Sequence, residues 1–115
     1  MKFPDPEQCE ELSPRQVNEI IGEGGDFDLI DCREQDEWDL CRLDNARHVA
    51  LSAFALNVSS LLALDAKPMV IYCHHGMRSL HATRWLRQQG RQNVFSLSGG
   101  IQRWSEEIDP QVPMY

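Results

Sequence analysis

The chain has 115 residues and a mass of 13.2 kDa, a size that predicts a single domain over residues 1–115. Its hydrophobic content of 42% and charged content of 25% are those of an ordinary globular protein. The net charge of −7 and the pI of about 4.9 argue against nucleic acid or an anionic membrane as a partner. Any anionic ligand must be bound locally by a few amides and arginines, which favours a small substrate.

Targeting signals and cysteine usage indicate the compartment. No apolar run is long enough to cross a bilayer, and the segment Met1–Pro6 lacks the apolar core of a secretory signal, so we expect a cytoplasmic protein. None of the cysteines forms a Cys-x-x-Cys pair, and a reducing compartment keeps them as thiols. We expect one reactive cysteine and three structural or incidental ones among Cys9, Cys32, Cys41 and Cys73.

The first half of the chain alternates helix and strand patterns. A polar arm or lead-in strand over residues 1–11 is followed by Ser13 and Pro14, which fit a helix N-cap and first residue, with Gln16 placed for a capping box. That helix ends in the glycines of residues 22–25. Further elements are expected as a strand over 27–31, one or two helical turns over 37–40, a weaker strand over 46–51 and a helix over 56–64.

The second half continues the alternation. Residues 69–72 are the clearest strand of the sequence, and a helical pattern that begins at Ser79 or Leu80 ends at Gly90. The remaining expectations are a strand over 94–97, a turn over 98–100, a helix from 101 to about 108 and an irregular tail over 109–115.

This alternation predicts an α/β fold, with a parallel sheet flanked by helices on both faces. Ligands of such folds sit outside the carboxyl ends of the strands. Three segments lie just past strand ends, namely Asp31–Arg33, Cys73 and Ser98–Gly100, so we expect them to cluster.

Cys73 is the strongest candidate for a reactive residue. It ends an apolar strand pattern and begins a polar loop with one glycine, Gly76, before the next helix. Backbone amides converge at such a turn, and the positive end of the helix dipole favours an anion there. Both effects lower the pKa of a thiol, and the thiolate is the nucleophile.

Three segments of the chain, in order, resemble the rhodanese-like (sulfurtransferase) domain family. Leu29-Ile30-Asp31-Cys32-Arg33-Glu34 with Glu37-Trp38 is similar to the family's first motif, and Tyr72-Cys73-His74-His75-Gly76-Met77-Arg78-Ser79 is similar to its active-site loop. Val94–Ile101 with Trp104 is similar to the closing segment, and Asp109–Tyr115 resembles the end of rhodanese domains fused behind adenylyltransferases.

The resemblance implies a rhodanese-like fold and a thiosulfate or persulfide sulfurtransferase that holds sulfane sulfur as a persulfide on catalytic Cys73. The expected partners are a small anionic donor (thiosulfate or a persulfide) and a thiol or cyanide-like acceptor, with a protein acceptor left open. No cofactor and no metal are expected. Substrate binding is expected from the loop and one upstream arginine: His74, His75, Gly76, Met77, Arg78, Ser79 and Arg33. Structural support is expected from Asp31, Gly99 and Gly100.

Two of these residues carry a positive charge. Arg78 is the best candidate to attract an anionic donor, whereas Arg33 is either a second cationic contact or an ion-pair partner of a carboxylate such as Asp31 or Glu37. The amides of the loop can stabilise the charged outer sulfur of a persulfide without a dedicated base.

Loop length separates two chemistries. Cysteine phosphatases place five residues between cysteine and arginine, whereas four separate Cys73 from Arg78. The smaller ring suits one sulfur atom better than a tetrahedral phosphoryl group. The alternatives are therefore a non-enzymatic persulfide carrier or protein-interaction module and, less favoured, a cysteine phosphatase or arsenate reductase-like enzyme.

Some positions depart from the family pattern. Cys32 replaces an apolar residue, so core packing is expected for it rather than a redox role. The adjacent His74 and His75 have no second cluster with zinc spacing, which argues against a metal site. Whether Arg42, Arg47 and His48 mark a partner surface stays open.

Overall fold

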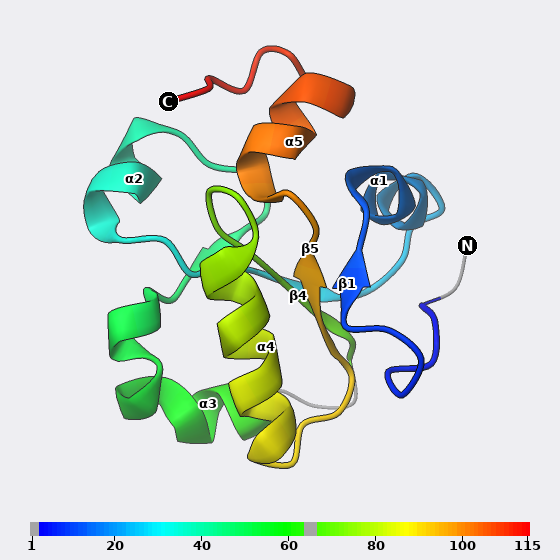
Figure 1. Ribbon diagram of the computed structural model, residues 1–115, viewed down its shortest axis with the longest axis vertical. Coiled ribbons are helices and arrows are strands. Elements are labelled where there is room, and N and C mark those ends of the chain that lie inside the picture. The colour runs from blue at the N-terminus through cyan, green and yellow to red at the C-terminus, as the bar shows by residue number, and fades with distance from the viewer. Residues whose placement is uncertain (1–2, 64–66) are drawn as a thin grey trace.

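The computed structural model describes residues 3–63 and 67–115, and its strands and helices alternate along the chain (Figure 1). The strands are β1 (Glu11–Leu12), β2 (Asp28–Asp31), β3 (Arg47–His48), β4 (Met69–Tyr72) and β5 (Val94–Leu97). The helices are α1 (Pro14–Gly22), α2 (Gln35–Leu40), α3 (Val58–Ala63), α4 (Met77–Gln88) and α5 (Gly100–Glu107), with 3-10 turns at Leu51–Ala53 and Ala55–Asn57.

The five strands form one sheet in the order β1-β5-β4-β2-β3, and every adjacent pair is parallel. This confirms the expected parallel α/β fold. The central strand β4 pairs with β2 on one side, where Asp31 lies opposite Tyr72, and with β5 on the other, where Ile71 lies opposite Ser96. All residues of β4 are buried, which is why its sequence is a continuous apolar run rather than an alternating one.

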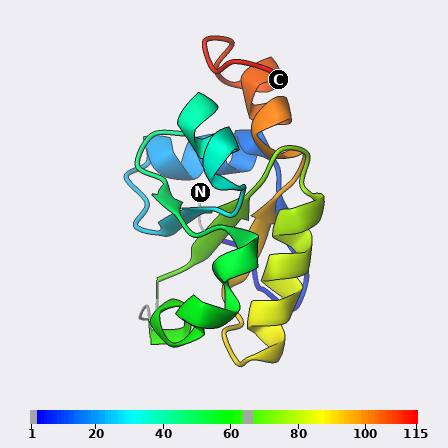
Figure 2. The ribbon, with the colours of Figure 1, turned by 90° about the vertical axis from the view of Figure 1, so that its left-hand side faces the viewer.

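Helices cover both faces of the sheet, with α1 and α5 on one side and α3 and α4 on the other (Figures 1 and 2). Alternate strand residues supply the two cores, because successive side chains of a strand point to opposite faces. The core under α1 and α5 contains Leu29, Val70, Tyr72, Phe95 and Leu97. The core under α3 and α4 contains Ile30, Cys32, Ile71, Cys73 and Val94.

The helix boundaries confirm some sequence expectations and correct others. Ser13 and Gln16 form the predicted capping box at the start of α1. Helix α4 begins at Met77, earlier than the predicted Ser79 or Leu80, because Gly76 acts as its N-cap with a φ of 103°.

The helix expected over 56–64 is divided into a 3-10 turn followed by α3. Leu56 is 90% exposed in that turn, so it does not contribute to the predicted apolar face, and Leu64 lies outside the described residues. Within residues 3–63 and 67–115, none of the helices combines the length and apolar character that crossing a bilayer requires.

Helix α5 starts in contact with the backbone that follows β4. The amides of Ile101 and Gln102 donate to the carbonyl oxygens of Cys73 and His74, at 2.9 and 3.1 Å. Gly100 makes this approach possible: its φ is +63°, and a Cβ there would overlap both carbonyl groups.

Gly100→Ala is therefore expected to lower the free energy of unfolding by about 3 kcal/mol, because left-handed backbone strain adds to steric overlap. Urea unfolding measures the change. Gly24→Ala is the matched control, because Gly24 has a φ of +75° with open space around it and should lose only about 1 kcal/mol. Equal losses in both variants would contradict the close contact.

Candidate active site

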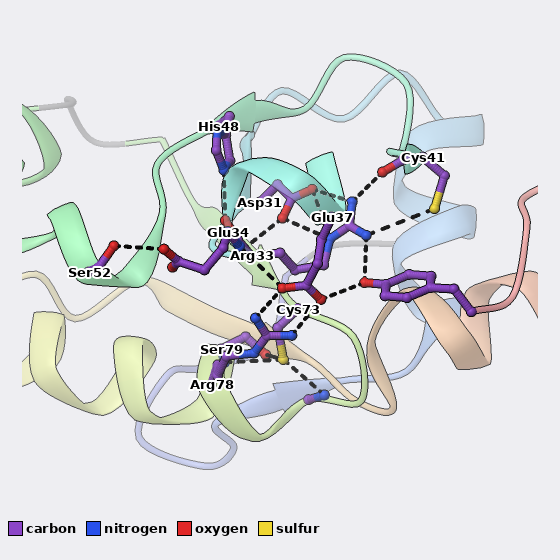
Figure 3. A network of polar contacts seen from close by, with 12 residues as sticks. Asp31, Arg33, Glu34, Glu37, Cys41, His48, Ser52, Cys73, Arg78 and Ser79 are labelled. Atoms are coloured by element: carbon purple, nitrogen blue, oxygen red, sulfur yellow. Dashed lines mark hydrogen bonds and ion pairs between the residues drawn. The ribbon is translucent and has the colours of Figure 1, made fainter. Parts of the chain in front are cut away.

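Cys73 follows the central strand and is 1% exposed. Its Sγ accepts hydrogen bonds from the amide of Gly76 at 3.0 Å and the amide of Ser79 at 3.4 Å, and the Ser79 hydroxyl lies at 3.4 Å (Figure 3). Two of the loop amides proposed from the sequence thus point at the sulfur. Because Ser79 lies in the first turn of α4, the sulfur also faces the positive end of that helix.

The environment strongly favours the thiolate of Cys73. The largest effect is a hydrogen bond from the Cys32 thiol, which lowers the pKa; burial acts against it, and the donors of Ser79 and Gly76 lower the pKa further. Together they bring the pKa of Cys73 to about 4. The sulfur is therefore a thiolate at neutral pH, in the form that attacks electrophiles.

The hydroxyl of Ser79 is held by its own neighbours. Its Oγ lies 2.7 Å from the Oγ of Ser96 on β5, and Ser79 O accepts from the Thr83 hydroxyl at 2.8 Å. All three residues are fully buried. When Cys73 is charged, the hydroxyl proton of Ser79 points to the sulfur, and the hydroxyl proton of Ser96 can point to the Ser79 oxygen. The end of β4, strand β5 and helix α4 together hold the Ser79 hydroxyl in place as a donor.

Arg33 lies in a fully buried ion pair with Asp31, which holds its Nη2 at 2.7 Å and its Nε at 3.0 and 3.1 Å from the two carboxylate oxygens. It also donates to the carbonyl of Cys41 and to the Tyr115 hydroxyl. Of the two roles considered from the sequence, this geometry favours the structural ion pair over direct contact with substrate.

Arg78 is paired as well. Its Nη1 and Nη2 reach the two oxygens of Glu37 at 2.6 and 2.9 Å, and Arg78 holds the pKa of that carboxyl down at about 2 (Figure 3). The Tyr115 hydroxyl donates to Glu37 at 2.8 Å while it accepts from Arg33 at 2.7 Å. A single tyrosine thus links the two ion pairs beside the cysteine loop.

The histidines form the outer part of the loop. His74 lies between the rings of His75 and Tyr115, with both centroid distances at 3.9 Å. Burial and the neighbouring His75 lower the pKa of His74, which favours its neutral form. His75 and Met77 are exposed, and they form the surface that an incoming molecule meets.

The expected cluster of strand-end segments is present. A Cβ on Gly76 would lie 3.1 Å from the amide nitrogen of Gly99, and Gly100 packs on the carbonyls of Cys73 and His74. Asp31 ends β2 and Cys32 and Arg33 follow it. They lie next to Cys73, because the Cys32 amide donates to the Tyr72 carbonyl at 3.0 Å. Across residues 3–63 and 67–115, no three His, Cys, Asp or Glu side chains are grouped so as to hold a metal ion.

Arg42, Arg47 and His48 make separate contacts. Arg42 stacks over Trp38 at 4.4 Å, Arg47 donates to Ser60, and His48 bonds the Arg33 carbonyl through Nε2 at 2.7 Å. His48 therefore supports the buried arginine.

Three contributors were not identified from the sequence: the thiol contact of Cys32, the pairing of Glu37 with Arg78, and Tyr115. One feature of the sequence could have indicated the role of Cys32, because it directly follows a predicted strand that lies beside β4. Tyr115 carried none, because an irregular tail gives no periodicity that would place its side chain.

Ser79→Ala should raise the pKa of Cys73 by about one to two units, since a hydrogen bond to a charged group contributes about 1.5–3 kcal/mol. Iodoacetamide alkylation followed against pH measures the thiolate fraction; its midpoint for the unaltered protein is expected at about 4. Ser105→Ala removes another buried serine hydroxyl, one that bonds the Val112 carbonyl rather than the sulfur, and should leave the midpoint in place. An unmoved midpoint in Ser79→Ala would exclude the hydroxyl as a donor.

Comparison with known proteins places this geometry in a family. The model of the rhodanese-like domain matches residues 13–107. A probable adenylyltransferase/sulfurtransferase MoeZ of Mycobacterium tuberculosis is 28% identical over 90% of this chain and 26% of its own length. A chloroplastic rhodanese-like/PpiC domain-containing protein 12 of Arabidopsis thaliana is 32% identical over 94% of this chain and 36% of its own length.

Solved structures of rhodanese-like proteins have the same fold as this chain. A rhodanese-related protein from Thermoplasma volcanium superposes with a TM-score of 0.76 at 26% identity, over 92% of this chain and 99% of that one. The human single-domain sulfurtransferase TSTD1 gives a TM-score of 0.73 at 22% identity, over 86% and 97% of the two chains. This chain spans about a quarter to a third of the curated relatives above. The match of the family model over most of the chain shows that it belongs to the rhodanese-like domain family.

Proposed function

We propose that this protein is a sulfurtransferase that moves sulfane sulfur from thiosulfate or a persulfide donor to a thiophilic acceptor through a persulfide on Cys73. The observation that carries the proposal is the buried Cys73 thiolate. Its sulfur accepts hydrogen bonds from two backbone amides and faces the start of α4. Its family relatives include proteins named as sulfurtransferases, which supports the same class of reaction.

In the first step the Cys73 thiolate attacks the outer sulfur of thiosulfate. A bond forms between the two sulfurs while the donor's S–S bond breaks, and sulfite leaves with that electron pair: Cys–S⁻ + S–SO₃²⁻ → Cys–S–S⁻ + SO₃²⁻. The negative charge then resides on the outer sulfur, where the amides and dipole of the loop stabilise it. No proton moves, so the site needs no general base.

In the second step an acceptor nucleophile attacks the outer sulfur, and the Cys73 thiolate leaves. With cyanide the balance is Cys–S–S⁻ + CN⁻ → Cys–S⁻ + SCN⁻. The low pKa of Cys73 helps here too, because a thiol of lower pKa is the better leaving group. The same surroundings of Cys73 thus favour both its attack on the donor and its departure from the persulfide.

The size of the loop supports sulfur over phosphoryl chemistry. The amides of Gly76 and Ser79 both lie within 3.4 Å of Sγ, so the cradle closes tightly around the thiolate. Arg78 is occupied by Glu37 through both terminal nitrogens. A phosphatase needs that arginine to bind the phosphoryl oxygens, so this pairing disfavours the phosphatase alternative.

Intact mass after incubation with thiosulfate tests the proposal. The protein should gain about 32 Da, the mass of one sulfur on a thiol, and cyanide should remove it with release of thiocyanate. Cys73→Ala should gain nothing, whereas Cys9→Ser, which replaces a half-buried cysteine outside the site, should behave like the unaltered protein. No gain with thiosulfate or an organic persulfide, or a gain that survives Cys73→Ala, would overturn the proposal. Transfer to a protein thiol without turnover on cyanide would favour the carrier alternative.

The ion pair of Arg78 and Glu37 predicts opposite effects of two substitutions on anionic donors. Arg78→Ala should raise KM for thiosulfate about tenfold, or about 1.4 kcal/mol, because the loop loses its cation. Glu37→Gln leaves that charge unpaired and should lower KM. Steady-state kinetics with thiosulfate, compared with a neutral dialkyl trisulfide as donor, separates charge from folding. If KM rises for both donors in both variants, the ion pair of Arg78 and Glu37 has a purely structural role.

A further inference from the structure

Cys32 and Cys73 directly follow two adjacent strands, β2 and β4. Asp31, the last residue of β2, lies opposite Tyr72, the last residue of β4, and each cysteine is the residue that comes next in the chain. The ladder continues through this position, since Cys32 donates its amide to Tyr72 at 3.0 Å. Adjacent strands are about 4.8 Å apart, within the range that disulfide geometry accepts between α-carbons.

Both side chains point to the same face of the sheet. The two cysteines belong to the core under α3 and α4, at 0% and 1% exposure, and the Cys32 thiol lowers the pKa of Cys73. The four cysteines of the chain are free thiols. Cys9 and Cys41 pack against the core on the other face, so Cys32 is the thiol that shares Cys73's side of the sheet.

The sulfur of Cys73 is therefore approached from two sides. The loop amides and the exposed His75 and Met77 lie on the side where donors and acceptors enter. Cys32 approaches from the core, among Ile30, Phe54 and Ile71, where no second substrate can reach. The sulfur transfer proposed above uses the first side and gives Cys32 no covalent role.

We infer that Cys32 is a resolving thiol: when no acceptor arrives, it attacks the inner sulfur of the Cys73 persulfide, closes an intrachain Cys32–Cys73 disulfide and releases hydrosulfide. This inference rests on the proposed persulfide, and it adds a second fate for the same intermediate. It makes the protein a source of hydrosulfide as well as a sulfane-sulfur donor.

The step balances without an outside oxidant. The S–S bond of the persulfide breaks as the new S–S bond forms, and the proton of Cys32 goes to the departing sulfur: Cys73–S–S⁻ + Cys32–SH → Cys73–S–S–Cys32 + HS⁻. The sulfane sulfur is reduced and the two cysteines are oxidised. A dithiol reductant then restores both thiols and is itself oxidised to a disulfide, which completes the cycle.

The protonation state of Cys32 is consistent with an attack that occurs only after the persulfide has formed. Its pKa is raised by the hydrogen bond to Cys73 and by burial, so it stays protonated and unreactive while Cys73 is a thiolate. Once the persulfide forms, the charge moves to the outer sulfur, further from Cys32, and the thiol faces an electrophilic inner sulfur. The buried position excludes other thiols from that attack.

The test follows the persulfide with time. The full chain is loaded with thiosulfate, desalted, and held without acceptor while intact mass and alkylation-trapped hydrosulfide are measured. The species that carries about 32 Da extra should convert to one about 2 Da lighter than the reduced protein, with release of hydrosulfide. Peptide mapping without reductant should find Cys32 joined to Cys73.

Cys32→Ser keeps a hydrogen-bond donor beside the sulfur but cannot close the disulfide. Once it has been loaded with sulfur, it should therefore release hydrosulfide at least about tenfold more slowly than the unaltered protein. Cys9→Ser, the matched control on the other face of the sheet, should behave like the unaltered protein. Cys32→Ala provides a second variant if the serine fails to fold, and the mapping on the unaltered chain needs neither.

The outcomes separate the two proposals. An unaltered protein that gains no sulfur would overturn the proposed function. One that gains sulfur but holds it as long as Cys32→Ser does would overturn this inference alone, as would disulfides mapped to Cys41 or between two chains.

Discussion

A negative charge on an almost fully buried sulfur is the interaction on which this site depends. Burial alone would raise the pKa of Cys73, yet the thiolate is stabilised until the pKa lies at about 4. The compensation comes from donors on three segments: Cys32 after β2, Gly76 in the loop, and Ser79 in α4. A parallel sheet supplies that convergence, because the carboxyl ends of its strands meet at one edge.

Around the sulfur, the charged side chains neutralise one another. Asp31 pairs with Arg33, Glu37 pairs with Arg78, and Tyr115 bridges the two pairs through one hydroxyl. The site is therefore stabilised by directed backbone and thiol donors more than by a free cation. This suits a protein with a net charge of −7, which can hold a small anion without a broad basic surface.

The sequence allowed the fold to be predicted, and Cys73 to be proposed as the reactive residue, because both rest on local patterns. The apolar run of β4, the capping box of α1 and the ordered motifs identified the sheet, its helices and Cys73. The early start of α4 was missed because a glycine N-cap with positive φ carries no side-chain signal.

The remaining parts of the site depend on contacts between distant segments. Cys32 was correctly expected in the core, but its contact with Cys73 follows from the register of β2 and β4, which no local pattern specifies. The same holds for Tyr115, whose ring position is decided by packing on His74. The sequence left two roles possible for Arg33, a contact with substrate and a structural ion pair. The burial that distinguishes them cannot be predicted from the arginine and its neighbours in sequence.

The contact between α5 and the cysteine loop also bears on when the site can form during synthesis. The first amides of α5 hold the carbonyls of Cys73 and His74, and β5, which carries the Ser96 partner of Ser79, precedes that helix. A nascent chain that has exposed Cys73 to the surrounding solution thus still lacks the segments that shape its loop. During synthesis, the contacts of α5 and Ser96 that shape this loop can therefore form only after residues 94–107 have left the ribosome and folded back upon it.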